Sequence, residues 1–342
     1  MNHLQTRRIA STLASQQWKR NRIHQFYLLH QRNAKNYHCT TINNDKTQPS
    51  NQMEPMRPHP SSKQKRVSKD LGIQFPPYAD TGYVAPFSSP NPILHKEIMR
   101  DKLRTAGRLA REILDQTCAL AVEGITTDEI NDIMHVEILK KGAYPSPLNY
   151  SGFPKSICTS VNEVICHGIP DSRPLMKGDV VSFDVSCYYN GVHGDNCGTV
   201  IVGYDDSEEM SRQKRLVDCA KESLNQGIKA CAPEANLRDV GIAIHNVCDW
   251  YGYDTVKEYR GHGIGSQFHI PPFVKHYRND DDIPLKPGMV FTIEPMITEG
   301  SSECVVWNDQ WTVMTRDRGL AAQFEHMVLI TEDGVEILTQ LD

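Results

Sequence analysis

The chain lacks the sequence signatures of several large protein classes. None of its apolar runs approaches the roughly 20 residues that a membrane-spanning helix needs. It contains neither a GxGxxG nucleotide-binding turn nor a P-loop. Its ten cysteines include no CxxC pair, so we expect reduced core cysteines of an intracellular protein rather than a disulfide scaffold or a zinc finger.

Acidic residues are absent from the first 44 positions, although seven Lys and Arg lie there. Residues 1–75 carry a charge balance of +10 and residues 76–342 one of −15. An arginine-rich, acid-free N-terminus without a long apolar centre is typical of a mitochondrial transit peptide, which we assign to residues 1–45. The alternative is a basic tail that binds nucleic acid or nothing, but the acidic body disfavours nucleic acid as a partner.

The remaining sequence divides into an arm and a folded domain. Residues 46–90 are rich in Pro, Ser, Gln and Lys and are predicted to form a linker or extended arm. In residues 91–342, apolar periodicity predicts helices over 95–122, 207–231 and 236–251. A capping box, Thr126 to Glu129, starts one more helix that ends near Gly142. Because predicted hairpins alternate with these helices, we expect an α+β domain.

The segment from Asp179 to Val202 is predicted to be a β-hairpin that turns at Asn190-Gly191. That turn places Asp184 opposite Cys197, and Asp195 lies on the same face, one diagonal step of about 7–8 Å away. Two carboxylates on one buried face repel each other and are costly to desolvate, and a divalent metal ion removes both costs. The hairpin therefore predicts a metal site.

Three more candidate ligands lie further along the chain. Glu294 ends the apolar run 289–293 before a proline, which places it at the end of a strand. Glu325 opens a strand, and His262 lies between glycines that allow close approach of the backbone. Four carboxylates and one imidazole favour manganese, iron or cobalt, and zinc stays open. Two metal ions can share the set only if carboxylates bridge them, about 3.5–4 Å apart.

A weak internal repeat relates residues 175–184 to residues 285–294. In both segments a glycine turn leads into an apolar strand that finishes with a carboxylate. Two similar half-domains would bring both strand ends to one central site. The alternative is that turn-then-strand segments look alike everywhere.

From about Tyr83 to Leu341 the chain resembles methionine aminopeptidases of the first type, whose fold is called pita-bread. The resemblance rests on five segments in order: residues 156–170, the hairpin, and residues 261–269, 291–296 and 311–328. It implies an α+β fold in which a pseudo-twofold antiparallel sheet, flanked by helices, surrounds a central dinuclear metal site.

The resemblance also implies residue roles. Two divalent metal ions (cobalt, manganese, iron or zinc) are expected on Asp184, Asp195, His262, Glu294 and Glu325, with Asp195 and Glu325 bridging. His167 and His269 are expected to contact the substrate and stabilise the tetrahedral intermediate, while Glu294 moves a proton. The expected wall of the methionine pocket is Tyr150, Phe153, Cys158, Phe268 and Trp311.

The implied activity is removal of the N-terminal methionine from peptides and proteins with a small second residue, by water that two metal ions activate. We expect a monomer in the mitochondrion that acts on peptide and protein N-termini and binds neither nucleic acid nor a membrane. The alternatives are a proline-specific aminopeptidase or dipeptidase of the same fold, or a non-catalytic binding module, which the intact ligand set disfavours.

The sequence departs from the family pattern in a few places. Ala235 stands where relatives often have glycine, which predicts a strained or reshaped turn. The basic arm does not resemble the zinc-binding extension of cytosolic eukaryotic members, and the helical insertion of the second type is absent between His269 and Glu294. An organellar enzyme of the first type fits best.

Overall fold

The computed structural model describes residues 59–64, 66–87 and 89–341, which all belong to one unit of the chain. The predicted transit peptide, residues 1–45, lies outside the described residues, as does the beginning of the predicted arm. The described part of the arm is mostly irregular, with one short 3₁₀ turn, η2 (Lys69–Leu71). The boundary at residue 91 stays a prediction.

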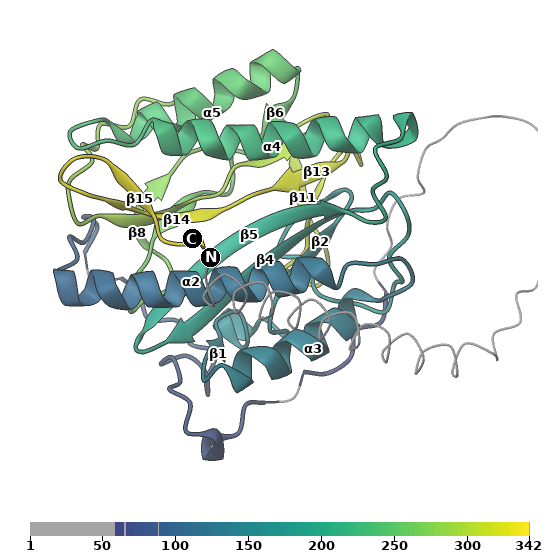
Figure 1. Ribbon diagram of the computed structural model, residues 1–342, viewed down its shortest axis with the longest axis horizontal. Helices are drawn as coiled ribbons and strands as arrows, with labels where there is room; N and C mark the ends of the chain where they lie inside the picture. The colour runs from purple at the N-terminus through teal and green to yellow at the C-terminus, as the bar shows by residue number, and fades with distance from the viewer. Residues whose placement is uncertain (1–58, 65, 88, 342) are drawn as a thin grey trace, which may run out of the picture. The chain divides into compact units, whose positions relative to one another are not determined.

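Two pairs of helices enclose the β-sheets between them (Figure 1). The first pair is α2 (Glu97–Ala119) and α3 (Thr127–Lys140), and the second is α4 (Ser211–Lys229) and α5 (Leu237–Tyr251). These are the four predicted helices. The capping box of α3 is present, since the Thr126 hydroxyl accepts from the Glu129 N–H while the Glu129 carboxylate accepts from the Thr126 N–H.

Two of the predicted helix starts are too early. α2 begins after His95, because the His95 N–H donates to Gly288 O at 2.8 Å and the backbone there is extended. The segment expected to start a helix at Ser207 forms a separate 3₁₀ turn first, η4 (Glu208–Met210). Both helix starts differ from the prediction by only a few residues, because the ends of a helix are its least well defined part.

The predicted hairpin is confirmed in position and register. β4 (Val180–Tyr189) and β5 (Val192–Ile201) pair antiparallel, with Asp184 opposite Cys197 and Ser186 opposite Asp195. Asn190 and Gly191 both have positive φ, 52° and 86°, as a type I′ turn requires. Two short strands, β1 (Tyr144–Pro145) and β2 (Cys158–Val161), pair with β4 and complete the first sheet.

Three further sheets are formed largely by the second half of the chain. The largest has the order β15-β14-β9-β7-β8, with bounds Val335–Ile337, His326–Ile330, Val290–Ile293, Gly261–Gly263 and Ile270–Val274. β13 (Ala321–Gln323), β10 (Met296–Thr298) and β6 (Asp254–Thr255) form the second. β11 (Cys304–Val306), β12 (Val313–Thr315) and β3 (Val164–Cys166) form the third. Between His269 and Glu294 the described chain forms no helix.

The internal repeat extends beyond the two segments seen in the sequence. The Leu175 N–H donates to Ile125 O at 2.7 Å, and at the same offset the Leu285 N–H donates to Ala235 O at 2.8 Å. In each half a helix pair packs on its own apolar cluster, α2 and α3 over the hairpin and α4 and α5 over β9 and β14. The two halves therefore share one plan.

The turn at Ala235 is strained, as predicted, but the strain does not fall on Ala235 itself. The left-handed residue of that turn is the preceding one, Glu234, with φ of 65°. In the first half the same place is held by Gly124, with φ of 89°. Ala235 is tolerated because its backbone does not need positive φ, and the cost of about 1–3 kcal/mol falls on Glu234 instead.

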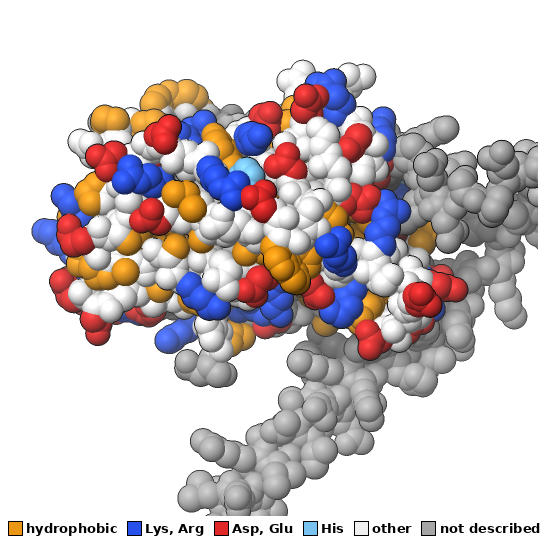
Figure 2. Space-filling model, turned by 90° about the horizontal axis from the view of Figure 1, so that it is seen from above, with side chains coloured by type: hydrophobic (Ala, Val, Ile, Leu, Met, Phe, Trp, Pro, Cys, Tyr) orange, Lys and Arg blue, Asp and Glu red, His pale blue; other side chains and the backbone are white. Residues whose placement is uncertain are grey.

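The surface and the cysteines agree with the composition. The face over α4 and α5 carries Lys and Arg interspersed with Asp and Glu (Figure 2). Among the described residues, none of the helices has both the length and the apolar character needed to cross a membrane. The nine described cysteines are all free and mostly buried; Cys39 lies outside the described residues.

We predict that Gly194→Ala destabilises the fold. A Cβ at Gly194 would lie 2.2 Å from Ala106 O, so α2 could no longer rest on β5. Overpacking of this kind costs about 1–3 kcal/mol, measured as the free energy of unfolding in urea. The control is Gly334→Ala, where a Cβ meets nothing within 4 Å. Equal stability of the two variants would contradict this packing.

Candidate metal centre and substrate pocket

All twelve residues predicted to form the site line one cavity of about 280 Å³. They are Tyr150, Phe153, Cys158, His167, Asp184, Asp195, His262, Phe268, His269, Glu294, Trp311 and Glu325. They come from both halves of the chain, so the cavity lies where the halves meet. Their roles stay predictions, but the fold does bring all of them to one cavity.

The polar end of the cavity collects the five predicted metal ligands. One ligand atom each of Asp195, His262 and Glu325 lie within 4.8 Å of one another. His262 Nε2 is 3.5 Å from Asp195 Oδ2 and 3.7 Å from Glu294 Oε1. Asp184 faces the same cavity from β4. Spacings of this size leave room for a cation between the donors.

Strand ends and close backbone contacts bring these side chains together. Glu294 directly follows β9, as predicted, and Glu325 directly precedes β14 instead of opening it. The Glu325 N–H donates to Cys197 O at 2.9 Å, which ties this residue to the hairpin. The glycines beside His262 are required, since a Cβ at Gly261 would lie 2.3 Å from a backbone oxygen.

Neighbouring polar groups hold the ligands in place. Asp195 Oδ1 accepts a hydrogen bond from Ser186 Oγ at 2.8 Å, and Glu294 Oε1 accepts one from Thr292 Oγ1 at 2.9 Å. The Thr292 hydroxyl oxygen also accepts from the His262 N–H at 2.9 Å. Such supporting contacts orient ligands and are part of a working metal site.

The ligand cluster gathers acidic groups whose charged forms disfavour one another. Burial, reinforced by the other carboxylates, raises the pKa of Asp184 and of Glu325 well above the usual range. Burial also raises the pKa of Glu294 to about 7, although His262 acts in the opposite direction. Arg260 is the one Lys or Arg among the described residues that line the cavity. Hard oxygen donors with one imidazole and excess negative charge fit divalent metal ions.

Aromatic rings and one thiol form the apolar wall of the same cavity. Phe153 and Trp311 meet edge to face with ring centroids 5.1 Å apart, and so do Tyr150 and Phe268 at 5.1 Å. Burial raises the pKa of Cys158 well above its usual value, so its thiol stays neutral. Rings and a polarizable sulfur suit an unbranched apolar side chain such as a thioether.

Two partly buried histidines lie beside the ligand cluster and the wall. Burial lowers the pKa of His167 to about 4 and that of His269 well below its usual value. Both imidazoles are therefore neutral near pH 7. His269 Nδ1 is 2.7 Å from the Tyr150 hydroxyl, which orients the ring. His167 has φ of 56°, a left-handed conformation that is costly outside glycine.

Sequence reasoning missed five residues that line the cavity: Pro147, Ser186, Tyr259, Arg260 and Met296. The hairpin register could have found Ser186, because it faces Asp195 across the two strands. Nothing in the local sequence marks the others, which reach the cavity through the tertiary fold.

Comparison with known proteins agrees with the geometry. Residues 101–332 match metallopeptidase family M24. Methionine aminopeptidase 1D of Arabidopsis thaliana, chloroplastic/mitochondrial, is 47% identical over 268 residues, which cover 78% of this chain and 75% of that protein. Mitochondrial methionine aminopeptidase 1D of Mus musculus is 46% identical over 269 residues, 79% of each chain.

A solved structure shares the architecture. Methionine aminopeptidase from Rickettsia prowazekii superposes with a TM-score of 0.70 at 43% identity, over 73% of this chain and 100% of that one. The pita-bread fold expected from the sequence is thereby confirmed. The resemblance to methionine aminopeptidases is confirmed as well, and the chain belongs to metallopeptidase family M24.

Proposed function

We propose that this protein removes the N-terminal methionine from peptides and proteins, with a preference for a small second residue, in the mitochondrion. The observation that carries the proposal is the convergence of an acidic ligand cluster, two neutral histidines and a sulfur-lined aromatic wall on one cavity. Relatives named as mitochondrial methionine aminopeptidases, at 45–46% identity, support both the reaction and the compartment.

Divalent metal ions belong to this site. We assign two of them to Asp184, Asp195, His262, Glu294 and Glu325, with Asp195 and Glu325 shared, and their identity is cobalt, manganese, iron or zinc. Support for the shared pair comes from the donor atoms of Asp195 and Glu325, which lie within 4.8 Å of each other. When bound, such ions supply a polarised carbonyl and a water molecule of lowered pKa.

The protein's own groups would complete the hydrolysis. The Glu294 carboxylate takes the proton from the attacking water and passes it to the leaving amine. A Tyr150 hydroxyl that donates to His269 Nδ1 leaves Nε2–H free to donate to the developing oxyanion, and the neutral ring of His167 does the same. A single donor of this kind lowers the activation barrier by about 3–4 kcal/mol in other enzymes.

The carboxylates and the aromatic wall together explain why an N-terminus would be cut. The aromatic wall receives the methionine side chain, which places the α-amine towards the carboxylates. A charged amine is stabilised there and a continuing polypeptide chain is not, because the cavity would have to admit an uncharged peptide group beside buried carboxylates. The site thus selects free N-termini by charge.

A peptide panel tests the reaction. With manganese or cobalt added, we expect Met-Ala-Ser to be cleaved and Ala-Pro-Ser to be left intact, measured by release of the free first residue. Faster cleavage of Ala-Pro-Ser would identify a proline-specific peptidase. If neither peptide is cleaved, the result would favour a non-catalytic binding module.

Substitutions separate ligands from substrate contacts. Asp195→Asn is expected to abolish turnover, because it weakens the hold on both metal ions. His167→Ala should lower kcat by about 100-fold, the loss of one oxyanion donor, with metal content near that of the unsubstituted protein. Metal content is measured by plasma emission spectroscopy after gel filtration. Loss of metal from His167→Ala would make that residue a ligand.

The metal-free protein should gain stability when a ligand loses its charge. The native pKa of Glu294, about 7, lies above its usual value, so metal-free stability falls as pH rises from about 4.5 to 7, by about 1.4 kcal/mol for each pKa unit. Glu294→Gln in EDTA should therefore be the more stable protein at pH 8 and lose that advantage at pH 4.5.

The control for this comparison is Glu332→Gln, at an exposed position. Urea denaturation at both pH values measures the difference. A Glu294→Gln protein that is no more stable than this control at pH 8 would show that the cluster is not electrostatically frustrated without metal.

A further inference from the structure

The arm, which we define as the described residues from 59 to 84, lies before the region that the family match covers, residues 101–332. Its composition predicts a linker, but several of its side chains are buried, among them Val67, which is 9% exposed, and Tyr78, which is 5% exposed. These two form one apolar cluster with Tyr144, Leu148 and Tyr188. The arm is therefore packed into the catalytic body.

The start of the arm holds the loop that follows His167. Ser61 Oγ donates to Pro170 O at 2.6 Å, and the Ser172 N–H donates to Pro60 O at 2.9 Å. Both contacts fall three to five positions after His167 in the chain. The backbone of that loop is thus bonded to the arm by two hydrogen bonds.

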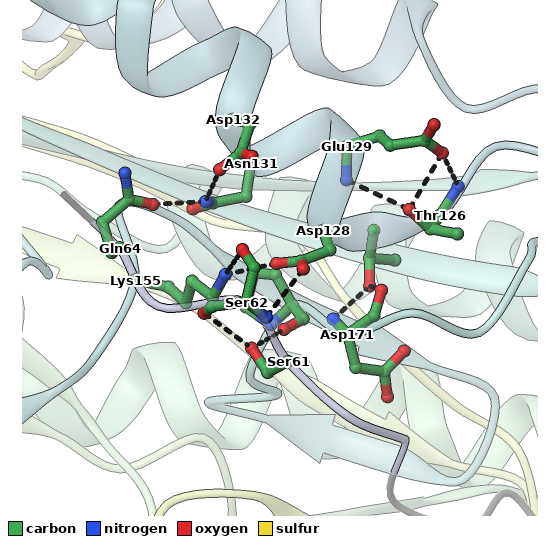
Figure 3. Close-up of polar contacts among 12 residues, drawn as sticks. Ser61, Ser62, Gln64, Thr126, Asp128, Glu129, Asn131, Asp132, Lys155 and Asp171 are labelled. Atoms are coloured by element: carbon green, nitrogen blue, oxygen red, sulfur yellow. Dashed lines mark hydrogen bonds and ion pairs between the residues drawn. The ribbon is translucent and has the colours of Figure 1, made fainter.

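A buried ion pair anchors this contact (Figure 3). The Lys155 side chain is fully buried and pairs with Asp128 at the start of α3. Lys155 Nζ also donates to Ser62 Oγ at 3.0 Å, and the Ser62 N–H donates to Asp128 Oδ2 at 2.8 Å. A buried ammonium needs several partners to offset its desolvation, and the arm supplies one of them.

The end of the arm supports the other substrate histidine. Tyr78 donates its hydroxyl to Ser146 O at 2.6 Å, and its ring meets the Tyr150 ring edge to face, with centroids 5.0 Å apart. The Tyr150 hydroxyl in turn lies 2.7 Å from His269 Nδ1. Tyr78 thus lies directly behind the residue that orients His269.

Tyr78 also backs the aromatic wall by a second route. Its ring lies nearly parallel to the His193 ring, with centroids 6.1 Å apart. His193 stacks on Phe268 at 4.7 Å. Tyr78 therefore supports two wall residues of the cavity: it contacts Tyr150 directly, and it contacts Phe268 through His193.

We propose that the arm is a positioning element of the active site. Its start fixes the loop of His167 through Ser61, and its end fixes Tyr150, and with it His269, through Tyr78. The proposal rests on the proposed function for its kinetic test. The physical reason is that a displacement of about 1 Å at a catalytic group can cost a hundredfold in rate.

Substitutions at Tyr78 in the full chain test the proposal. Tyr78→Ala should lower kcat on Met-Ala-Ser by about tenfold or more, with a smaller change in KM and unchanged metal content. Tyr78→Phe keeps the ring contact and should restore most of the rate. The matched control is Tyr83→Ala, a tyrosine of the same arm that is 69% exposed and should behave as the unsubstituted enzyme.

A double-mutant cycle distinguishes positioning from general loss of stability. If Tyr78 acts through Tyr150, then Tyr78→Ala costs much less in a Tyr150→Phe background than alone. Full additivity of the two effects on kcat would overturn this route. So would a folded Tyr78→Ala enzyme with the kcat of Tyr83→Ala.

Hydrogen exchange decides the proposal without any activity. Tyr78→Ala should speed amide exchange in residues 147–153, and Ser61→Ala should speed it in residues 167–172, while Tyr83→Ala changes neither. Unchanged exchange in both segments would overturn the proposal. If the unsubstituted protein fails to cleave Met-Ala-Ser, that result would contradict the proposed function alone. The exchange rates would still test the positioning role, because they do not depend on peptidase activity.

Discussion

Mutual repulsion among buried carboxyl groups is the constraint on which this structure depends. Asp184, Asp195, Glu294 and Glu325 face one cavity, and burial pushes the pKa of three of them upward. A fold tolerates such a cluster only if rigid elements hold it together and cations neutralise it. Strand ends, glycines without room for a Cβ and hydroxyl donors provide the rigidity.

The duplicated plan of the fold explains how such a cluster can be built from distant sequence. Asp184 lies in the strand that opens the first half's hairpin, and Glu294 directly follows the equivalent strand of the second half. The backbone bonds between Cys197 and Glu325 join the two halves at the site. Two similar units that pack about a centre bring equivalent carboxylates to the same place, and no long loop is needed.

Parts of this arrangement could be predicted from sequence because short-range geometry determines them. The Asn190-Gly191 turn sets the hairpin register, and the register alone places Asp195 one step from Asp184. Glu294 could be placed because a proline follows it. The wall residues, in contrast, were assigned by family resemblance, since Tyr150 or Trp311 has no local pattern that separates it from an ordinary core aromatic.

The rest could not be predicted, because it depends on contacts between segments far apart in the chain. Tyr259 and Met296 reach the cavity only through tertiary packing. The arm is the clearest case. Its composition is that of a linker. Nothing in the sequence around Tyr78 indicates a hydrogen bond to Ser146, and nothing around Ser62 indicates one from the buried Lys155. The strain of the turn at Ala235 falls on Glu234, one position earlier, since backbone dihedral angles at a turn cannot be predicted from composition.

The central claim is that a cluster of buried carboxylates closes around a pair of divalent cations. Anomalous diffraction from crystals grown with manganese tests this most directly. The account predicts two anomalous peaks about 3.5–4 Å apart, each within bonding distance of Asp195 and Glu325. A cavity without anomalous density, or manganese bound only outside these five side chains, would contradict it.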